Sequence, residues 1–431
     1  MKKKITSVKE ISGCITVPGD KSISHRSIML GALAEGRTEI SGFLESADCL
    51  STIRCIRAMG VQVEKNGDLY IVHGKGIGGF KEPADILDCG NSGTTIRLLS
   101  GLVAGLGFHA VLTGDHSLRT RPMTRIKNPL MEMGAKFDGR ENGKFAPISL
   151  RGGFLHGIDY RMQIASAQVK SAILLAGLNA SGETSVFELL SSRDHTERML
   201  ASFGADVEVQ KAADGTTIKL RPSALKAVNV EVPGDISSAA FFLTAAAAMP
   251  GAELTVKNVG LNPARTGILD VLDRMGANVE ILNASLNAGE IVGDVKIIGN
   301  HLKAIQIYDY EIPALIDEVP IIAVAAAVAE GETVITGASE LKVKESDRLA
   351  VMASELAKVG VDVEELPDGL IIRGGRPIKG GKVNSFSDHR IAMAMAVCGL
   401  FSKEGIEIEG SDAVAISFPD FFEKLDSVCG R

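Results

Sequence analysis

The chain has 431 residues, enough for two or three domains, and its 46 basic and 53 acidic side chains give a formal net charge of −7. The negative balance argues against nucleic-acid binding, and an apolar fraction of 45% argues against disorder. The six cysteines contain no CxxC pair, so the sequence predicts neither a disulfide framework nor a zinc site.

Residues 1–4 (MKKK) are followed by polar residues, which is not the pattern of a signal peptide. The longest apolar stretch, residues 319–329, is far shorter than the roughly 20 residues that a membrane-spanning helix needs. We therefore expect a cytoplasmic protein that binds neither a membrane nor a nucleic acid.

One pattern recurs six times along the chain: a polar cluster, an apolar helix, a turn with glycine and a strand. The first five copies continue into a second helix that ends at a glycine and then into a strand pair. These glycines are Gly60, Gly134, Gly204, Gly276 and Gly360. The sixth copy runs out of chain after its first helix and strand, and we expect a strand pair within residues 5–18 to complete it.

Six units of this βαβαββ type indicate an α/β fold with two similar domains of three units each, closing on an interdomain cleft. The expected domains are residues 21–232 and residues 1–20 with 233–431. The phrase VPGD occurs at 17–20 and again at 232–235. We interpret both copies as strands of a hinge, and the alternative is an ordinary tight turn that happens to recur.

The residues that open the six first helices combine caps with cations. Serine and aspartate are common N-caps, but lysine, arginine and glutamine are not. Helix N-termini bind anions through free N–H groups and partial positive charge, so cations beside them indicate a strongly anionic small ligand. The opening residues are Lys21, Ser22, Ser92, Gly93, Ser166, Gln168, Asp235, Ser237, Asp317, Asp388, His389 and Arg390.

Two further segments add cations. Residues 113–125 contain Arg119, Arg121 and Arg125, whose guanidinium groups suit a ligand with phosphate and carboxylate. In residues 343–349 we expect Lys344 and Arg348 to share a helix face. A solvated charged face is the alternative interpretation of both segments.

Cofactor motifs are not supported. GxGxxG occurs at residues 74–79 without a following helix, no GxxxxGK[ST] motif is present, and no ligand set with metal spacing is found. We therefore expect a reaction without a cofactor and without a metal.

Eight motifs together resemble the 5-enolpyruvylshikimate-3-phosphate synthase family. They are GDKSISHR (19–26), CGNSGTTIRLLSG (89–101), GDHSLRTRPM (114–123), SAQVKSA (166–172), RDHTERML (193–200), IDEVP (316–320), VKESDRL (343–349) and SDHRIAMA (387–394). They cover essentially the whole chain. The resemblance implies transfer of the enolpyruvyl group of phosphoenolpyruvate to the 5-hydroxyl of shikimate 3-phosphate, with release of phosphate, on the route to chorismate and the aromatic amino acids.

The resemblance also implies site residues. For shikimate 3-phosphate they are Lys21, Ser22, Arg26, Ser166, Ala167, Gln168, Arg193, Asp317 and Lys344. For phosphoenolpyruvate they are Lys21, Gly93, Arg121, Gln168, Arg348 and Arg390. Asp317 resembles the base that takes the 5-hydroxyl proton, although a helix cap is the alternative role, and either Glu345 or Lys21 would protonate the enol carbon. Small-molecule substrates and a monomer are the expected partners and assembly.

Two departures from the family pattern stand out. Ala167 replaces a second serine that some members carry, and Ile416 and Ser417 stand where some members have a lysine. These features and RDHTERML resemble the branch that includes glyphosate-tolerant enzymes. Gly93 is where an alanine would crowd glyphosate, so tolerance stays open.

Two rival functions remain. The related transferase that acts on UDP-N-acetylglucosamine carries a reactive cysteine in its mobile loop, whereas residues 114–125 contain none. A non-catalytic anion-binding protein on the same repeats would bind phosphate ligands without turnover.

Overall fold

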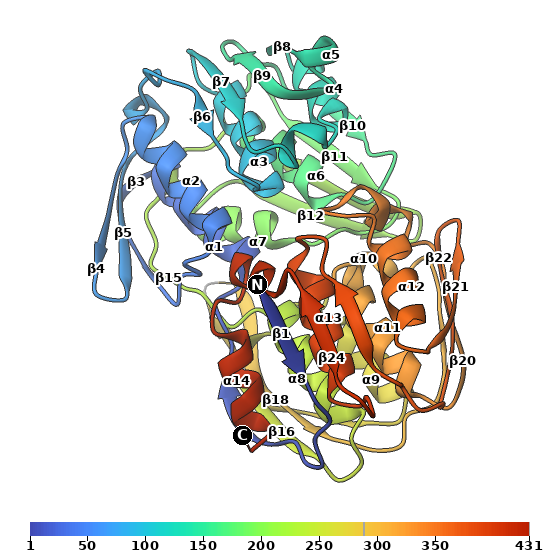
Figure 1. Cartoon of the computed structure of the whole chain (residues 1–431). Coiled ribbons are helices and arrows are strands. Elements are labelled where there is room, and N and C mark those ends of the chain that lie inside the picture. The colour runs from blue at the N-terminus through green and yellow to red at the C-terminus, as the bar shows by residue number, and fades with distance from the viewer. Residues whose placement is uncertain (288, 431) are drawn as a thin grey trace. The chain divides into compact units, whose positions relative to one another are not determined.

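The computed structural model describes residues 1–287 and 289–430, and the chain divides into two compact units (Figure 1). Unit A consists of Gly19–Val232 with Leu286–Glu290, and unit B of Met1–Pro18, Pro233–Ser285 and Ile291–Arg431. Each unit has its own apolar core. The chain therefore passes between the units within both VPGD phrases, while a hinge motion there stays a prediction.

Unit A alternates helices with short strands. Its helices are α1 (Lys21–Leu33), α2 (Ala47–Ala58), α3 (Gly93–Ala104), α4 (Thr124–Glu132), α5 (Arg140–Gly143), α6 (Ala167–Gly177) and α7 (His195–Ser202), with 3₁₀ turns η1 (Ile77–Gly79) and η2 (Leu118–Thr120). Its strands are β3 (Ala34–Ser41), β4 (Gln62–Asn66), β5 (Leu69–Lys75), β6 (Leu87–Asp88), β7 (His109–Thr113), β8 (Lys136–Gly139), β9 (Phe145–Arg151), β10 (Asp159–Arg161), β11 (Thr184–Glu188), β12 (Val207–Ala212), β13 (Gly215–Leu220), β14 (Leu225–Lys226) and β15 (Val230–Glu231).

Unit B repeats the arrangement. Its helices are α8 (Ile236–Ala247), α9 (Gly267–Arg274), α10 (Ile312–Leu315), α11 (Val319–Val328), α12 (Arg348–Lys358), α13 (His389–Gly399) and α14 (Phe421–Val428), with η3 (Ser339–Val343) and η4 (Ser411–Ile416). Its strands are β1 (Lys2–Ile5), β2 (Ser12–Thr16), β16 (Glu253–Gly260), β17 (Asn278–Asn287), β18 (Glu290–Ile298), β19 (Gln306–Ile307), β20 (Gly331–Ile335), β21 (Asp362–Leu366), β22 (Gly369–Gly374), β23 (Gly381–Asn384) and β24 (Ile406–Glu409).

The described strands form six sheets, which confirms the six predicted units. In a typical sheet the order is β10-β11-β13-β12, with β10 parallel to β11 and the β12–β13 hairpin antiparallel. The hairpins follow helices that end at glycines with positive φ, for example +86° at Gly60 and +90° at Gly360. Glycine adopts this backbone without a steric cost, so it ends each second helix where the sequence predicts.

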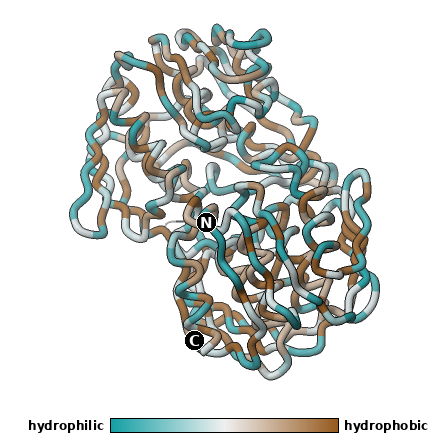
Figure 2. The backbone as a smooth tube through the Cα atoms, viewed as in Figure 1, coloured by the Kyte–Doolittle hydropathy of each residue, from teal (hydrophilic) through white to brown (hydrophobic). Residues whose placement is uncertain are grey.

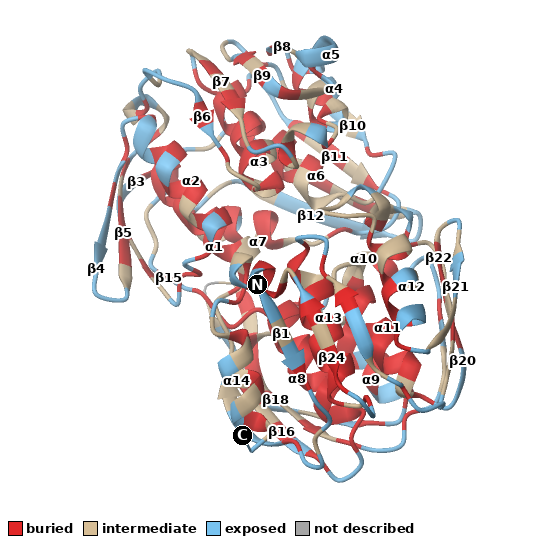
Figure 3. Cartoon of the chain, viewed as in Figure 1, coloured by how far each residue is buried: buried red, intermediate tan, exposed pale blue. Residues whose placement is uncertain are grey.

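The first helices are buried nearly all round, as Figure 3 shows for α3, α6, α8, α11 and α13. Their sequences are apolar on every face, which is typical of a helix inside a core. Along the strands burial alternates, as in β13, and hydrophobic and hydrophilic stretches accordingly interleave along the chain (Figure 2). Burial of the helices leaves their polar first residues as the groups that can face a ligand.

The N-terminal strands differ from the prediction. β1 pairs antiparallel with β24, which completes the last sheet as expected, but β2 pairs parallel with β16 in another sheet. The expected strand pair within residues 5–18 is therefore wrong. The sixth copy also has a second helix, α14, followed by Gly430 with φ +66°. β24 would otherwise have an unpaired edge, and β1 covers it.

Two sheets gain an outer strand from the segment that leads into the other unit. β2 precedes α1 of unit A but pairs with β16 of unit B, and β14 and β15 precede α8 of unit B but pair with β3 of unit A. Each of these segments leads into one of the VPGD phrases. The recurrence of the phrase thus corresponds to equivalent positions in the two units.

Candidate active site

In unit A the first helix of each repeat, α1, α3 and α6, is capped by a side chain. Asp20 accepts a hydrogen bond from the Ile23 N–H at 2.8 Å, and Ser92 accepts one from the Thr95 N–H at 3.0 Å. Ser166 accepts a longer bond, 3.5 Å, from the Val169 N–H. Capping therefore explains Ser92 and Ser166, but Lys21 and Ser22 follow the cap of α1 and need another role.

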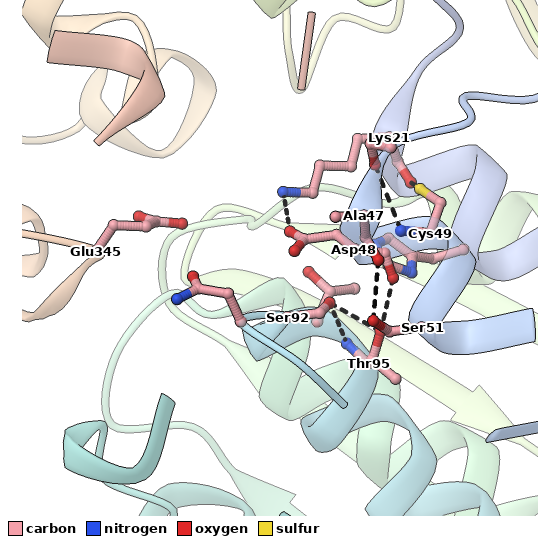
Figure 4. Close-up of polar contacts among 12 residues, drawn as sticks. Lys21, Ala47, Asp48, Cys49, Ser51, Ser92, Thr95 and Glu345 are labelled. Atoms are coloured by element: carbon pink, nitrogen blue, oxygen red, sulfur yellow. Dashed lines mark hydrogen bonds and ion pairs between the residues drawn. The ribbon is translucent and has the colours of Figure 1, made fainter. Parts of the chain in front are cut away.

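Lys21 forms an ion pair with Asp48, the second residue of α2 (Figure 4). Asp48 is buried, with 5% of its surface exposed, and the lysine side chain is 19% exposed. Figure 4 also shows Ser92 and Thr95 bonded beside Asp48, whose carbonyl accepts from the Thr95 hydroxyl at 3.3 Å. Asp48 thus holds a cation at the start of α1, and the sequence analysis did not identify it.

Arg26 lies one turn further along α1 and is buried. Its Nε donates to the Thr196 hydroxyl at 2.7 Å and one terminal nitrogen donates to the Ser171 hydroxyl at 2.8 Å, while the other donates to the Ser22 carbonyl at 3.0 Å. Burial lowers the pKa of the guanidinium to about 10, and the charge of Arg193 adds to the lowering. Arg26 therefore stays charged at neutral pH.

A second group of contacts surrounds Gly93, the first residue of α3. Arg121 donates to the Asn91 side-chain oxygen at 2.7 Å, and Arg97 donates to the Gln168 amide oxygen at 2.5 Å. A Cβ atom at Gly93 would lie 3.2 Å from Nη1 of Arg97 and 3.3 Å from Nη1 of Arg121. The absence of a side chain at Gly93 thus leaves room next to two guanidinium groups.

The other predicted cations of this segment differ from Arg121. Arg121 is buried, with 6% of its surface exposed, whereas Arg119 is half-buried and Arg125 is exposed on α4. The backbone carbonyl of Arg119 accepts a hydrogen bond from the Arg140 side chain. Of the three arginines, the structure therefore favours Arg121 as a ligand-binding group.

The predicted residues at the start of α6 and before α7 lie in the same unit. Ser166, Ala167 and Gln168 open α6 and are half-buried, and Arg193 is half-buried in the segment that precedes α7. Gln168 also donates to the Thr94 hydroxyl at 3.1 Å, which links α6 to α3. Unit A therefore brings together its predicted residues at the starts of α1, α3 and α6.

Unit B contains a carboxylate cluster around Arg348. The guanidinium is 1% exposed and contacts Asp388 at 2.9 Å, Glu345 at 2.7 Å and Asp317 at 3.4 Å. Burial alone would lower the pKa of Arg348, but the three carboxylates, Asp388 first, raise it above its ordinary value. The cluster carries more negative than positive charge, so another cation or an exposed face must balance it.

Arg390 supplies a further cation. It donates to the Asp317 carbonyl at 3.0 Å, and its other terminal nitrogen lies 3.7 Å from the Asp317 carboxylate. Asp388 caps α13 by accepting from the Arg390 N–H at 2.9 Å. Asp317, Glu345, Arg348 and Arg390 therefore form one connected group.

Two local expectations are wrong. Lys344 does not share a helix face with Arg348, because Asp347 caps α12 and the helix begins at Arg348, which leaves Lys344 in the extended backbone before it. Asp317 is not the cap of the fifth helix either, since Glu318 occupies the N-cap position and makes no capping bond. The cap interpretation of Asp317 therefore fails, and its contacts with arginines remain.

Asp48, which pairs with Lys21, and Arg97, which bonds to Gln168, are site residues that the sequence analysis did not identify. Arg97 follows Gly93 by four residues, so helix periodicity could have placed both on one face of α3. Asp48 could have been noticed as an acidic residue in the first turn of a predicted helix, although many surface helices begin this way. Neither signal distinguishes a functional contact from a solvated residue.

Within residues 1–287 and 289–430, no group of three or more histidine, cysteine, aspartate or glutamate side chains could hold a metal ion. In the same part of the chain, no helix has the length and hydropathy to cross a membrane.

Buried arginines near helix starts, such as Arg26, Arg121 and Arg348, are typical of an α/β protein that binds small, strongly anionic molecules. Comparison with known proteins agrees with this class. Residues 5–425 match the family described as EPSP synthase (3-phosphoshikimate 1-carboxyvinyltransferase). The chain belongs to this family.

Individual relatives are similar over their full length. The chain is 54% identical to 3-phosphoshikimate 1-carboxyvinyltransferase from Alkaliphilus metalliredigens, covering 98% of each chain, and 54% identical to that of Geobacillus kaustophilus, covering 98% and 99%. A solved structure of EPSP synthase from Acinetobacter baumannii has a TM-score of 0.87 at 46% identity and covers 99% of this chain and 98% of its own. The predicted family and the α/β fold with repeated units are thus confirmed.

Proposed function

We propose that the residues described above carry out the reaction of this family in the chain, the transfer of the enolpyruvyl group of phosphoenolpyruvate to the 5-hydroxyl of shikimate 3-phosphate. The observation that carries the residue assignment is the contact of Asp317 with both Arg348 and Arg390. Asp317, which we propose as the base, lies beside two guanidinium groups of the kind that bind a phosphate and a carboxylate. A base held there can act on a hydroxyl next to the bound donor.

Unit A would bind shikimate 3-phosphate. Arg26 and Arg193 are cations near the start of α7, and the starts of α1 and α6 provide N–H groups and hydroxyls for the phosphate. The proposed residues are Lys21, Ser22, Arg26, Ser166, Ala167, Gln168 and Arg193, with Asp317 and Lys344 from unit B.

Phosphoenolpyruvate would bind at the group of cations around Gly93. Gly93 exposes the start of α3 beside Arg121, and Gln168 is held by Arg97. Lys21, Arg348 and Arg390 complete the proposed set. Five charged or polar side chains around one donor suit a molecule that carries both a phosphate and a carboxylate.

The chemistry is an addition followed by an elimination. Asp317 would take the proton of the 5-hydroxyl of shikimate 3-phosphate. The hydroxyl oxygen then bonds to C2 of phosphoenolpyruvate while C3 gains a proton. Loss of a proton from C3 and of phosphate from C2 then restores the double bond. Either Glu345 or Lys21 would donate and reclaim the C3 proton, since both carry a proton-exchanging group at the proposed donor site.

The reaction assay tests the function directly. Phosphate release from phosphoenolpyruvate is measured with shikimate 3-phosphate or with UDP-N-acetylglucosamine, without added metal and with a chelator. We expect release only with shikimate 3-phosphate, and its loss in Asp317→Ala but not in Asp273→Ala, which changes an exposed carboxylate of α9. Release only with the nucleotide sugar, or none from folded protein, would contradict the proposal.

Hydrogen exchange separates the two candidate proton donors. In deuterated water, the wild-type enzyme should place deuterium at C3 of phosphoenolpyruvate that is recovered during turnover. Glu345→Gln and Lys21→Met are compared at equal residual substrate binding. The variant that loses deuterium incorporation identifies the donor, and retention in both would exclude both residues.

A further inference from the structure

Lys170 is a lysine in the interior of unit A that the proposed reaction does not use. It lies on α6, four residues after Ser166, and is 1% exposed. Removing an ammonium group from water is unfavourable unless partners replace the water. Buried partners must therefore replace the water that would otherwise solvate its ammonium group.

Its partners come from three successive segments. The ammonium nitrogen lies 2.8 Å from a Glu188 carboxylate oxygen at the end of β11 and 2.6 Å from Glu197 on α7. It also donates to the carbonyl of Ser192, between these two elements, at 3.4 Å. Glu188, Ser192 and Glu197 are all buried, with at most 5% of their surface exposed. One ammonium group thus joins α6, the end of β11, the connecting segment and α7.

Glu188 also holds the connecting segment, through both of its carboxylate oxygens. The Ser192 hydroxyl donates to Glu188 Oε1, and the Ser192 N–H donates to Oε2 at 3.3 Å. Together with Lys170, Glu188 therefore fixes the N–H, the carbonyl and the side chain of Ser192. The next residue is Arg193, one of the proposed ligands of shikimate 3-phosphate.

The other side of the network adjoins Arg26. Thr196 precedes Glu197, and Ser171 follows Lys170; these two hydroxyls lie 2.6 Å apart, and each accepts one of the hydrogen bonds of Arg26. Helices α6 and α7 are therefore joined twice. Lys170 pairs with Glu197, and the adjacent residues Ser171 and Thr196 both bind Arg26. A shift of α7 against α6 would move both contacts.

The charges of the network also act on Arg26. Burial disfavours the charge of Lys170, but Glu197 and then Glu188 outweigh it and raise its pKa. With two carboxylates for one ammonium, the group carries surplus negative charge, and Glu197 is the carboxylate that most favours the charged form of Arg26. Buried ion pairs of this kind contribute little net stability compared with apolar side chains. Their positioning effect is the more specific consequence.

We propose that Lys170 is a positioning residue for shikimate 3-phosphate, which orients Arg193 through Ser192 and Arg26 through α7. The proposal rests on the proposed roles of Arg26 and Arg193. Lys170 itself does not contact the substrate. Its removal should weaken binding of shikimate 3-phosphate and affect phosphoenolpyruvate less, because Gln168, the proposed phosphoenolpyruvate ligand on α6, is held by Arg97 and Thr94 rather than by Lys170.

The test compares KM for the two substrates in Lys170→Met and in Ser192→Ala, which removes one anchoring bond without changing any charge. We expect Lys170→Met to raise KM for shikimate 3-phosphate about tenfold, with KM for phosphoenolpyruvate within about twofold of wild type. Ser192→Ala should raise the same KM by a smaller factor, and the double variant should fall short of the product of the two factors because both act on one segment.

Val186→Ala is the matched control. Val186 is fully buried in β11, two residues before Glu188, so its truncation lowers the melting temperature without touching the network. It should leave both KM values near wild type. If it raises KM for shikimate 3-phosphate as much as Lys170→Met does at a similar loss of melting temperature, the effect is general destabilisation and the proposal is wrong.

Arg193→Ala separates this proposal from the assignment of the site. If Arg193→Ala leaves KM for shikimate 3-phosphate unchanged, the proposed binding role of Arg193 fails. If it raises this KM while Lys170→Met and Ser192→Ala do not, only the positioning role of Lys170 is overturned. Should Lys170→Met fail to fold, Ser192→Ala decides the outcome by the same KM ratio.

Discussion

Asp388 caps α13 and at the same time binds the buried guanidinium of Arg348, with 2.9 Å between its oxygen and the arginine Nε. One carboxylate therefore fixes a helix start and a proposed substrate ligand. The burial of Asp388 would raise its pKa, but the charge of Arg348 outweighs burial and lowers it. The pair couples the fold of unit B to its site.

Asp388→Asn separates these two roles. Asparagine caps a helix about as well as aspartate, so the cap is retained and the charge is lost. Breaking a buried ion pair from one side costs about 3–5 kcal/mol. We expect a decrease of this order in the free energy of unfolding, measured by urea denaturation, and a higher KM for phosphoenolpyruvate. Asp420→Asn at the start of α14, where no side-chain cap is made, is the control and should change neither quantity.

The same pair predicts a pH dependence at low pH. Because the pKa of Asp388 is lower in the folded protein, its contribution to stability is complete above the unfolded value of about 3.9 and is lost as pH falls through the folded value. Wild type should therefore lose stability below about pH 4 more steeply than Asp388→Asn. If the free energy of unfolding falls with pH equally steeply in wild type and Asp388→Asn below about pH 4, the lowered pKa of Asp388 is wrong.

Asp48→Ala tests the contact with Lys21 that the sequence did not reveal. Without the carboxylate, the Lys21 ammonium loses the partner that fixes it at the start of α1. We expect kcat/KM to fall about tenfold, equivalent to about 1.4 kcal/mol of transition-state stabilisation. Steady-state kinetics measure this, with circular dichroism to confirm the fold. Unchanged kcat/KM would mean that Lys21 needs no anchor.

Gly93→Ala tests the space beside Arg97 and Arg121. The added Cβ would lie 3.2 and 3.3 Å from their Nη1 atoms, so one guanidinium must move by a few tenths of an ångström. We expect KM for phosphoenolpyruvate to rise several-fold and KM for shikimate 3-phosphate to change less. Gly107→Ala is the control, since a Cβ there meets no atom within 4 Å. Equal effects of both substitutions would show that the space at Gly93 is not specific.

The repeat pattern was predictable because each unit uses the same local signals. Apolar helices and glycine stops such as Gly60 follow from periodicity and backbone sterics, and both are read within a few residues. The pairing of β2 with β16 was not predictable, because a strand of five residues can pair with several sheet edges and only tertiary contacts select one. Leu286–Glu290, at the β17–β18 turn, likewise groups with unit A through contacts far apart in sequence, such as Glu290 with His195 at 2.7 Å.

The site shows the same division. The resemblance to the family identified Arg121, Arg348 and Arg390 from motifs, while their partners lie elsewhere in the chain. Asp48 reaches Lys21 from the next helix, and Asp388 reaches Arg348 over 40 residues of sequence. Motifs identify the residues proposed to contact substrates, whereas the residues that hold those side chains in place depend on packing that a single sequence does not reveal.

His25 provides a prediction for the pH range between 3 and 6.5. Its imidazole is fully buried on α1 and bonds to the Thr52 hydroxyl at 2.7 Å, which in turn lies 2.8 Å from the Thr95 hydroxyl. Burial, reinforced by the charge of Lys21, lowers its pKa from 6.5 to about 3. The folded protein therefore binds fewer protons than the unfolded chain throughout this range.

Stability should consequently fall as the pH decreases from 6.5, by about 1.4 kcal/mol per pH unit from this residue alone, until the pH approaches the folded pKa. His25→Asn removes the titrating group and should flatten the dependence, measured as the free energy of unfolding in urea at pH 7, 6, 5 and 4. His301→Asn, which changes an exposed histidine, should leave the slope as in wild type. If His25→Asn keeps the wild-type slope, the imidazole is already protonated in the folded state and the hydroxyl chain to Thr95 must rearrange to accommodate its charge.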